Sequence, residues 1–368
     1  MMRSEMRAAA VVSGVVMAGI GLLALAGDLN PPAGPVTPTM KSLDEVEPRI
    51  AVNAVNTPGD ANSIFQISQP GSYYLTGNVT GSVSHSGIEI VANGVTLDLN
   101  GFELVGVPGS LDGITVPGGS LRNIMVRNGT VRNWGDHGID LRATSCEVAS
   151  INASSNGAGG IRLGDNNTAR DCRVSINGGI GITTGNANVI TNCVTGSNTG
   201  TGMLIGTDCV VTQCVAFSNL FNGFEAGSGS RIVGCTARIN IDGIVGNGGG
   251  VLIADCTAVL NIGNGIVLSS DSRATNNISH DNTAVGLRVD GSSNRIEDNQ
   301  CTENGAGVSV IGTGNIIRSN TCSGNTTNWD IAAGNVCLIV QAATAGAING
   351  NAGGTSPGAL IPDTNFTY

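Results

Sequence analysis

The residues best suited to chemistry lie in one short segment, residues 134–142, which reads Trp-Gly-Asp-His-Gly-Ile-Asp-Leu-Arg. It holds one of the three histidines and one of the two tryptophans of the chain. Arginine binds carboxylates through paired hydrogen bonds, and histidine or aspartate can transfer a proton. We therefore predict a subsite for an acidic sugar. Its substrate contacts would be Trp134, Asp136, Asp140, Arg142 and Arg162, and its best catalytic candidates would be His137, Asp140 and Arg162.

In this interpretation an arginine holds the sugar carboxylate, His137 or an aspartate moves a proton, and Trp134 stacks on the sugar ring. Arg162 would lie beside Asp140, one structural repeat further along the chain. The alternative is an exposed ion pair, with Trp134 as a packing residue. The sequence leaves both interpretations open.

Other kinds of site find no support. Glycoside hydrolysis needs two carboxyl groups about 5 to 9.5 Å apart, whereas Asp140 and Glu225 would lie about 19 Å apart at about 4.8 Å per repeat. No CxxC or histidine spacing indicates a metal site, and no glycine-rich segment has the lysine of a phosphate loop. His85 and His280 are expected to be isolated surface or corner residues. We predict no metal, no cofactor and no recognisable catalytic motif, which favours a non-enzyme and leaves an enzyme open.

An internal repeat would position these residues. One column of residues recurs at intervals of 21 to 23: Asn128, Ile151, Cys172, Cys193, Cys214, Cys235, Cys256, Asn277, Asn299 and Asn320. Five residues after each position comes an asparagine, which gives a second column: Asn133, Asn156, Asn177, Asn198, Asn219, Asn240, Asn261, Asn282, Asn304 and Asn325. A Gly-apolar pair follows most of these asparagines, as in Gly138-Ile139.

The residue after each Gly-apolar pair is predicted to point outward. These residues would form one surface column: Asp140, Arg162, Thr183, Leu204, Glu225, Val245, Val267, Arg288 and Ser309. Arg288 and Asp290 are expected to form a solvated pair on one strand.

The repeat predicts an all-β fold, a right-handed parallel β-helix of about ten regular coils of 21 to 23 residues. Apolar residues alternate with polar ones over three to five positions, which is the period of a strand, and Asn and Gly separate the strands. Inward asparagines would form a ladder of hydrogen-bonded amides at a bend, where Asn tolerates the left-handed backbone. Glycines such as Gly164, Gly185 and Gly206 would mark the next corner. Irregular N-terminal coils and caps would close the ends.

The ten cysteines allow two interpretations. Stacked cysteines on adjacent coils would have Cα atoms about 4.8 Å apart, within the range that a disulfide allows. Five consecutive cysteines cannot all pair, and the side-by-side geometry of parallel strands suits the disulfide torsion poorly. We expect small buried hydrophobic residues, and the disulfide state stays open.

The N-terminus has the pattern of an export signal. Arg3 and Arg7 flank the start of an apolar run that ends in Ala24-Leu25-Ala26, an A-x-A cleavage pattern. A signal anchor is the alternative. We predict a signal peptide at 1–26, a linker at 27–63, the β-helix at 64–341, and a C-terminal cap and tail at 342–368. The protein would then be secreted, periplasmic or on the cell surface.

The charge of the chain disfavours some classes of binding partner. The net charge is −10 and Lys41 is the single lysine. An acidic chain without a basic stripe is poorly suited to nucleic acid or to an anionic membrane. We expect neither as a partner once the signal is cleaved. A polysaccharide remains a possible partner, and the sequence does not indicate the oligomeric state.

The repeat resembles the pectin-lyase-like superfamily of right-handed β-helices, and more closely the repeat of carbohydrate-binding proteins and sugar hydrolases. The resemblance covers about residues 70 to 335, and residues 95–101 and 126–131 resemble the entry coils of bacterial secreted members. It is specific for the fold and weak for function. It implies a secreted or cell-envelope protein that binds polysaccharide. The alternatives are an adhesin-like envelope rod without a ligand, or a divergent polysaccharide lyase or glycoside hydrolase.

Overall fold

The computed structural model describes residues 47–117, 120–341 and 363–367. The chain divides into two units, Met1–Pro48 and Arg49–Tyr368, and everything below concerns the second. The predicted signal peptide, most of the linker and residues 342–362 lie outside the described residues. Within the described ranges, no helix is long and apolar enough to cross a membrane.

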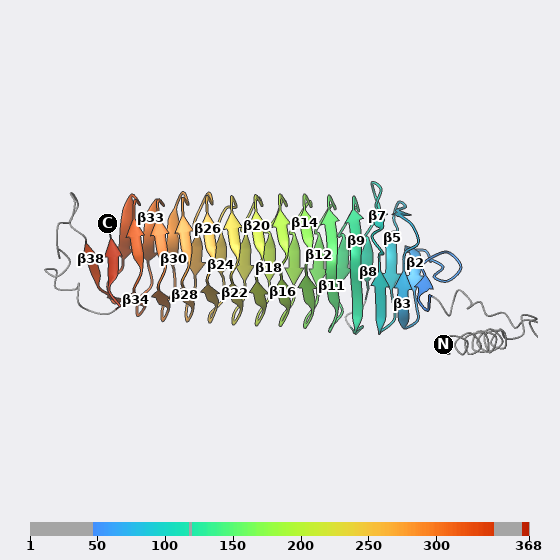
Figure 1. Cartoon of the computed structure of the whole chain (residues 1–368), viewed down its shortest axis with the longest axis horizontal. Helices are drawn as coiled ribbons and strands as arrows, with labels where there is room; N and C mark the ends of the chain where they lie inside the picture. The colour runs from blue at the N-terminus through green and yellow to red at the C-terminus, as the bar shows by residue number, and fades with distance from the viewer. Residues whose placement is uncertain (1–46, 118–119, 342–362, 368) are drawn as a thin grey trace, which may run out of the picture. The chain divides into compact units, whose positions relative to one another are not determined.

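Each coil contributes a single strand to one parallel sheet (Figure 1). We call it the 13-stranded sheet. Its strands, in spatial order, are β2 (Ser63–Ile67), β5 (Ser86–Ile90), β8 (Ile114–Val116), β10 (Ile139–Leu141), β12 (Ile161–Leu163), β15 (Ile182–Thr184), β18 (Met203–Ile205), β21 (Phe224–Ala226), β24 (Ile244–Gly246), β27 (Ile266–Leu268), β30 (Val285–Val289), β33 (Ala306–Val310) and β36 (Thr327–Ile331).

The other walls of the solenoid belong to a connected 26-stranded sheet. Its N-terminal strands are β1 (Ile50–Ala51), β3 (Gly71–Tyr74), β4 (Val79–Thr80), β6 (Val95–Asp98), β7 (Glu103–Val105), β9 (Ile124–Arg132) and β11 (Glu147–Ser154). Its middle strands are β13 (Thr168–Arg170), β14 (Arg173–Ser175), β16 (Val189–Thr191), β17 (Val194–Gly196), β19 (Val210–Thr212), β20 (Val215–Phe217), β22 (Arg231–Val233), β23 (Thr236–Arg238), β25 (Leu252–Ala254) and β26 (Thr257–Val259). Its C-terminal strands are β28 (Arg273–Thr275), β29 (Ile278–His280), β31 (Arg295–Glu297), β32 (Gln300–Thr302), β34 (Ile316–Arg318), β35 (Thr321–Ser323), β37 (Val336–Cys337), β38 (Ile339–Gln341) and β39 (Asn365–Thr367).

The predicted right-handed parallel β-helix is confirmed. The strands from β10 to β36 mark the ten regular coils, and β2, β5 and β8 belong to three irregular N-terminal coils. β1 lies within the predicted linker but pairs with β3, so the ordered unit begins before residue 64. A strand of two residues is too short to show a period in the sequence.

The asparagine ladder begins one coil later than predicted. From Asn156 to Asn304, the backbone N–H and the side-chain amide of each asparagine both donate to Oδ1 of the asparagine on the next coil, as between Asn198 and Asn219 at 3.2 and 3.0 Å. Asn133 is exposed and has a φ of 62°. The inward place on its coil belongs to Trp134, whose N–H donates to Asn156.

The inward asparagines and the predicted glycine column do not adopt the left-handed backbone that was expected at the corners. The left-handed residue is the one before each inward asparagine, such as Ser197 or Ser218. Gly206 in the predicted glycine column has no positive φ, but a Cβ there would lie 2.2 Å from the carbonyl oxygen of Gly185. These glycines are required because successive coils approach closely, and not because the chain turns left-handed.

A third inward column went unrecognised in the sequence. It runs Cys146, Asn167, Asn188, Cys209, Ser230, Val251, Ser272, Asn294, Asn315 and Asn335, joined in most steps by hydrogen bonds from one coil to the next. Each coil therefore has three corners at which a left-handed residue is followed by an inward residue. In the sequence, Cys146 and Cys209 occupy equivalent places three coils apart, which is the one sign of this column among the cysteines.

The thiols lie inside the solenoid. The described cysteines are free, and all but Cys337 are buried. Along the cysteine column a backbone N–H points to the sulfur on the next coil, as from Cys193 to Cys214 at 3.4 Å. The column continues through asparagines and ends at Asn365 of β39, which accepts two hydrogen bonds from Asn320, both at 2.9 Å.

Candidate functional site

The outward column predicted from the Gly-apolar pairs exists. Asp140 of β10 pairs in register with Arg162 of β12, and the same register continues along the sheet to Ser309 of β33. In the other direction the column extends to Thr115 of β8 and Glu89 of β5. Neighbouring members are about 4.8 Å apart, which is the spacing of adjacent strands.

Asp140 forms an ion pair with Arg142 and not with Arg162. Nη2 and Nε of Arg142 lie 2.6 and 2.9 Å from Oδ2 of Asp140. The Asp140 side chain is only 3% exposed, while that of Arg142 is 56% exposed and lies over it. Hydrogen bonding to Asp140 raises the pKa of Arg142. Asp140 lies in β10 and Arg142 directly follows that strand, so their pairing is local.

Arg162 is left without a carboxylate partner among the residues that the structure describes, and its side chain is half-buried. Arg162 does lie beside Asp140 in register, as the sequence predicted, but the ion pair of Asp140 is made with Arg142. The guanidinium of Arg162 keeps its donors available for a ligand that reaches this part of the sheet.

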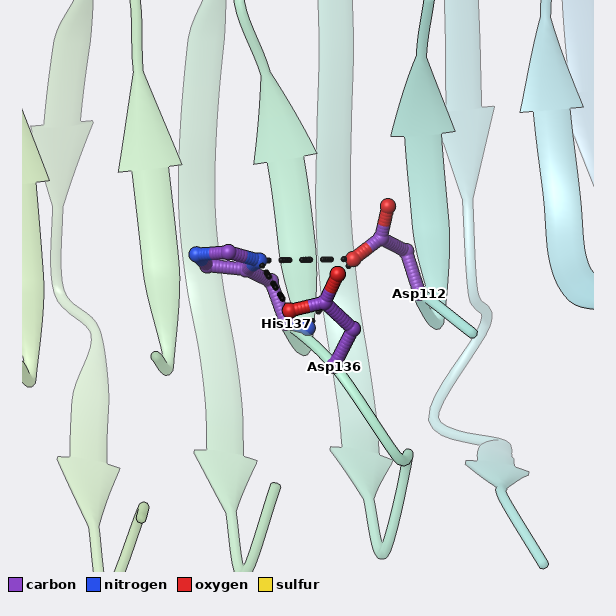
Figure 2. A group of neighbouring side chains, drawn as sticks. All are labelled: Asp112, Asp136 and His137. Atoms are coloured by element: carbon purple, nitrogen blue, oxygen red, sulfur yellow. Dashed lines mark hydrogen bonds and ion pairs between the residues drawn. The ribbon is translucent and has the colours of Figure 1, made fainter. Parts of the chain in front are cut away.

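Asp112, Asp136 and His137 form a cluster at the amino ends of β8 and β10 (Figure 2). Nδ1 of His137 lies 2.9 Å from Oδ1 of Asp136 and 3.5 Å from Oδ1 of Asp112. The backbone N–H of His137 also donates to Oδ1 of Asp112 at 2.9 Å. The side chains of Asp112 and His137 are 14% and 20% exposed, and that of Asp136 is 51% exposed.

The environment of His137 favours its charged form. The carboxylate of Asp112 beside the ring raises the pKa of the imidazole, burial opposes this, and the charges of Asp136 and Asp140 add to the rise. The ring packs over Gly159 of the next coil, where a Cβ would lie 3.0 Å from Cδ2 and 3.6 Å from Nε2. A proton-transfer group with one nitrogen held by carboxylates is what acid–base chemistry requires.

Trp134 cannot stack on a sugar. It is 1% exposed, and its indole N–H donates to the carbonyl oxygen of Leu104 at 3.2 Å. Its ring lies against Gly81 and Gly87 of the preceding coils. The predicted sugar contact is therefore corrected to a core role, in which the indole fills the end of the asparagine column.

Asp112 was missed in the sequence because it lies 25 residues before His137 and outside the regular repeat. His280 was expected to stand alone, but its Nε2 lies 3.2 Å from Asp281 and 3.8 Å from Glu303. Elsewhere, Glu297 is surrounded by Arg273, Arg295 and Arg318 from three neighbouring strands. The predicted pair of Arg288 and Asp290 is confirmed at 2.7 Å.

Comparison with known proteins finds similarity in fold and little similarity in sequence. Residues 197–327 match the family described as a right-handed β-helix region. No curated protein sequence matches this chain. The match and the topology agree in the coils from β18 to β33.

Two solved structures have a similar fold. The A-module of a mannuronan C-5 epimerase from Azotobacter vinelandii has a TM-score of 0.51 and 14% identity, covering 73% of this chain and 91% of that chain. The Dettilon tailspike protein has a TM-score of 0.50 and 16% identity, covering 72% of this chain and 62% of that chain. At these identities the likeness shows the fold alone.

Proposed function

We propose that this chain, a right-handed parallel β-helix of the pectin-lyase-like superfamily, binds a polysaccharide on the outer face of the 13-stranded sheet around β8, β10 and β12. The main observation in support is that ionisable side chains are concentrated on this part of the sheet. Asp112, Asp136, His137, Asp140, Arg142 and Arg162 come from three consecutive coils. Over the next coils the outward column is largely uncharged, with Thr183, Leu204, Val245 and Val267.

The local charges suit a hydroxyl-rich ligand with acidic groups. Arg162 can donate paired hydrogen bonds to a carboxylate, while Asp136 and the exposed edge of His137 can accept or donate to hydroxyls. Asp140 holds the guanidinium of Arg142 over the same face, and Arg162 lies in register on the next strand. A similar fold occurs in a mannuronan C-5 epimerase, which supports a glycan ligand.

The test is glycan binding by two matched variants. Arg162→Ala removes an unpaired arginine from the candidate surface, and Arg288→Ala removes an arginine from the same outward column, six coils away. We expect Arg162→Ala to weaken binding to a uronate polymer at least about tenfold, because one charge-assisted hydrogen-bonding group is worth about 1.5–3 kcal/mol. Arg288→Ala should leave the affinity unchanged, as measured by affinity electrophoresis.

Equal loss in both variants would show binding that does not depend on this surface. No shift with uronate, neutral or sulfated glycans would contradict the proposal and favour a structural protein of the cell envelope. Because arginine truncation on the outer face leaves the core intact, circular dichroism of both variants should match that of the wild type.

Proton-transfer catalysis is a second candidate, favoured by the carboxylates that flank Nδ1 of His137. A lyase or epimerase needs an acid–base group of this kind. The test is turnover of polygalacturonate and mannuronan by the wild type and by His137→Gln. Turnover that is lost in His137→Gln while glycan binding remains would support catalysis, and no turnover by the wild type would exclude it for these substrates.

We also propose that the protein works outside the cytoplasm. The charged start, apolar run and Ala-Leu-Ala pattern before residue 27 support this. Mature protein that begins near Gly27 in a secreted or periplasmic fraction would support cleavage. Retention of the intact N-terminus in the membrane fraction would favour the signal anchor.

A further inference from the structure

We propose that Asp112, Asp136 and His137 bind a divalent transition-metal cation of the zinc type (Figure 2). This proposal goes beyond glycan binding and does not depend on it. Three ligand atoms, one from each residue, lie within 4.8 Å of one another. The sequence had shown no such site because Asp112 joins the other two only when β8 and β10 become neighbours.

The spacing fits a tetrahedral ion. Metal–ligand bonds of about 2.0–2.2 Å place tetrahedral ligands about 3.3–3.6 Å apart. Nδ1 of His137 is 3.5 Å from Oδ1 of Asp112 and 2.9 Å from Oδ1 of Asp136. The oxygen of Asp136 must move away from Nδ1 by a few tenths of an ångström, and Asp136 is the most exposed of the three residues.

Nδ1 of His137 can become a ligand when a cation takes the place of the proton that the two carboxylates favour there. Nδ1 of His137 is buried from solvent but has no well-directed hydrogen bond among the described residues, despite its two carboxylate neighbours. A buried polar atom without a hydrogen bond is costly, and a bound cation would satisfy it. The packing of the ring over Gly159 already fixes its orientation.

The charge at the site also favours a cation. Asp112 and Asp136 surround a single imidazole, and no arginine forms an ion pair with either carboxylate in the part of the chain described. The guanidinium of Arg142, whose charge is felt by both carboxylates, is held by Asp140. The N–H of His137 holds Oδ1 of Asp112 in place, as outer hydrogen bonds do for metal ligands.

The donor set indicates the class of metal. One imidazole nitrogen and two carboxylate oxygens suit zinc and similar ions, and three protein ligands leave one position for water. Calcium prefers six to eight oxygen ligands, which these residues do not supply. The cluster of His280, Asp281 and Glu303 is a natural control. It is more exposed, and Nδ1 of its histidine already contacts the Thr302 hydroxyl at 3.0 Å.

The experiment is calorimetric titration of ZnCl₂ into chelator-treated full-length protein, with CoCl₂ and CaCl₂ as comparisons. We expect one equivalent of zinc, visible absorption typical of tetrahedral Co²⁺, and weak or no binding of calcium. His137→Gln and Asp112→Asn should each weaken zinc binding about tenfold or more. His280→Gln should leave it unchanged. Near-wild-type circular dichroism would show that the variants fold.

Three results would overturn the proposal: no zinc binding by the wild type, zinc binding unchanged in His137→Gln, or equal loss in His280→Gln. Calcium binding at the same residues and with similar strength would overturn the assignment to a zinc-type ion. Arg162→Ala should bind zinc normally, so failure of the glycan proposal and failure of the metal proposal can be told apart.

Discussion

Glu297 shows how one carboxylate can hold side chains from several coils together. Its side chain is 2% exposed and contacts Arg273, Arg295 and Arg318. Burial alone would raise the pKa of Glu297, but the hydrogen bond from Arg318 and the charges of the three arginines outweigh burial and lower it. The carboxylate is therefore charged in the folded protein, where it offsets the repulsion among the arginines.

This lowered pKa predicts a specific acid sensitivity. A group whose pKa falls on folding stabilises the protein above its ordinary value of 4.5, and that stabilisation is lost as the pH falls below it. The melting temperature of Glu297→Gln should therefore be lower than that of the wild type at neutral pH, and should fall less between about pH 5 and pH 3. Glu303→Gln, at a carboxylate that is 62% exposed, should follow the wild-type profile. Parallel profiles for Glu297→Gln and the wild type would contradict the prediction.

Single residues were the hardest part to predict from sequence. The outward places of Asp140 and Arg162 follow from strand alternation, so the sequence predicted them correctly. The sequence did not predict which arginine pairs with Asp140, because the side-chain rotamers of Arg142 and Arg162 decide between them. Trp134 differs by one position from the asparagine column, and that single step turns a surface residue into a core residue.

At the scale of the element, the corners carry an unexpected cost. Ile239 has a φ of 56°, although β-branched residues strongly disfavour the left-handed region. At the same corner Ser197 and Ser218 adopt this conformation on the coils before it. Ile239 is also 38% exposed, so burial does not compensate for the strain.

Replacement of Ile239 by asparagine should stabilise the protein by about 1 kcal/mol, because asparagine tolerates the left-handed region. Ile241→Asn is the control, since Ile241 is similarly exposed, at 41%, but has no positive φ. The midpoint of chemical denaturation should rise for Ile239→Asn only. An equal change in both variants would assign the effect to exposed apolar surface.

The corners also show why the sequence reveals the repeat but not the backbone conformation within it. The period of 21 residues predicted the inward columns of cysteine and asparagine. It could not tell which residue of each corner is left-handed, because Ser, Asp, Ile and Leu all occupy that place. The close approach at Gly206 likewise depends on the contact between coils, which local sequence does not encode.

At the scale of the whole solenoid, the ends need special residues. The open edge near β35 is paired by β39, and Asn365 continues the amide column beyond Asn320. The amide of Asn365 also donates to the carbonyl oxygen of Ile317 at 2.8 Å. The tail beyond residue 341 was predicted to act as a cap, and the pairing of β39 supports that role for residues 365–367.

Asn365→Ala should loosen the C-terminal coils without affecting the middle of the solenoid. The N–H and amide of Asn320 would lose their acceptor, and repeat proteins respond mainly in neighbouring units. Hydrogen exchange should accelerate in β34 and β35 but not in β20. Phe366→Ala, at a side chain that is 45% exposed, should have a much smaller effect. Uniform acceleration along the chain would contradict this expectation.

The constant length of the middle coils also bears on how such a chain can evolve. Asn198, Asn219, Asn240 and Asn261 occupy equivalent places at intervals of 21 residues. Loss or duplication of one 21-residue unit in the gene would rejoin amide to amide and leave every later strand in phase. The charged surface on β8 to β12 lies upstream of these coils, so the molecule could lengthen or shorten while its chemistry stays the same.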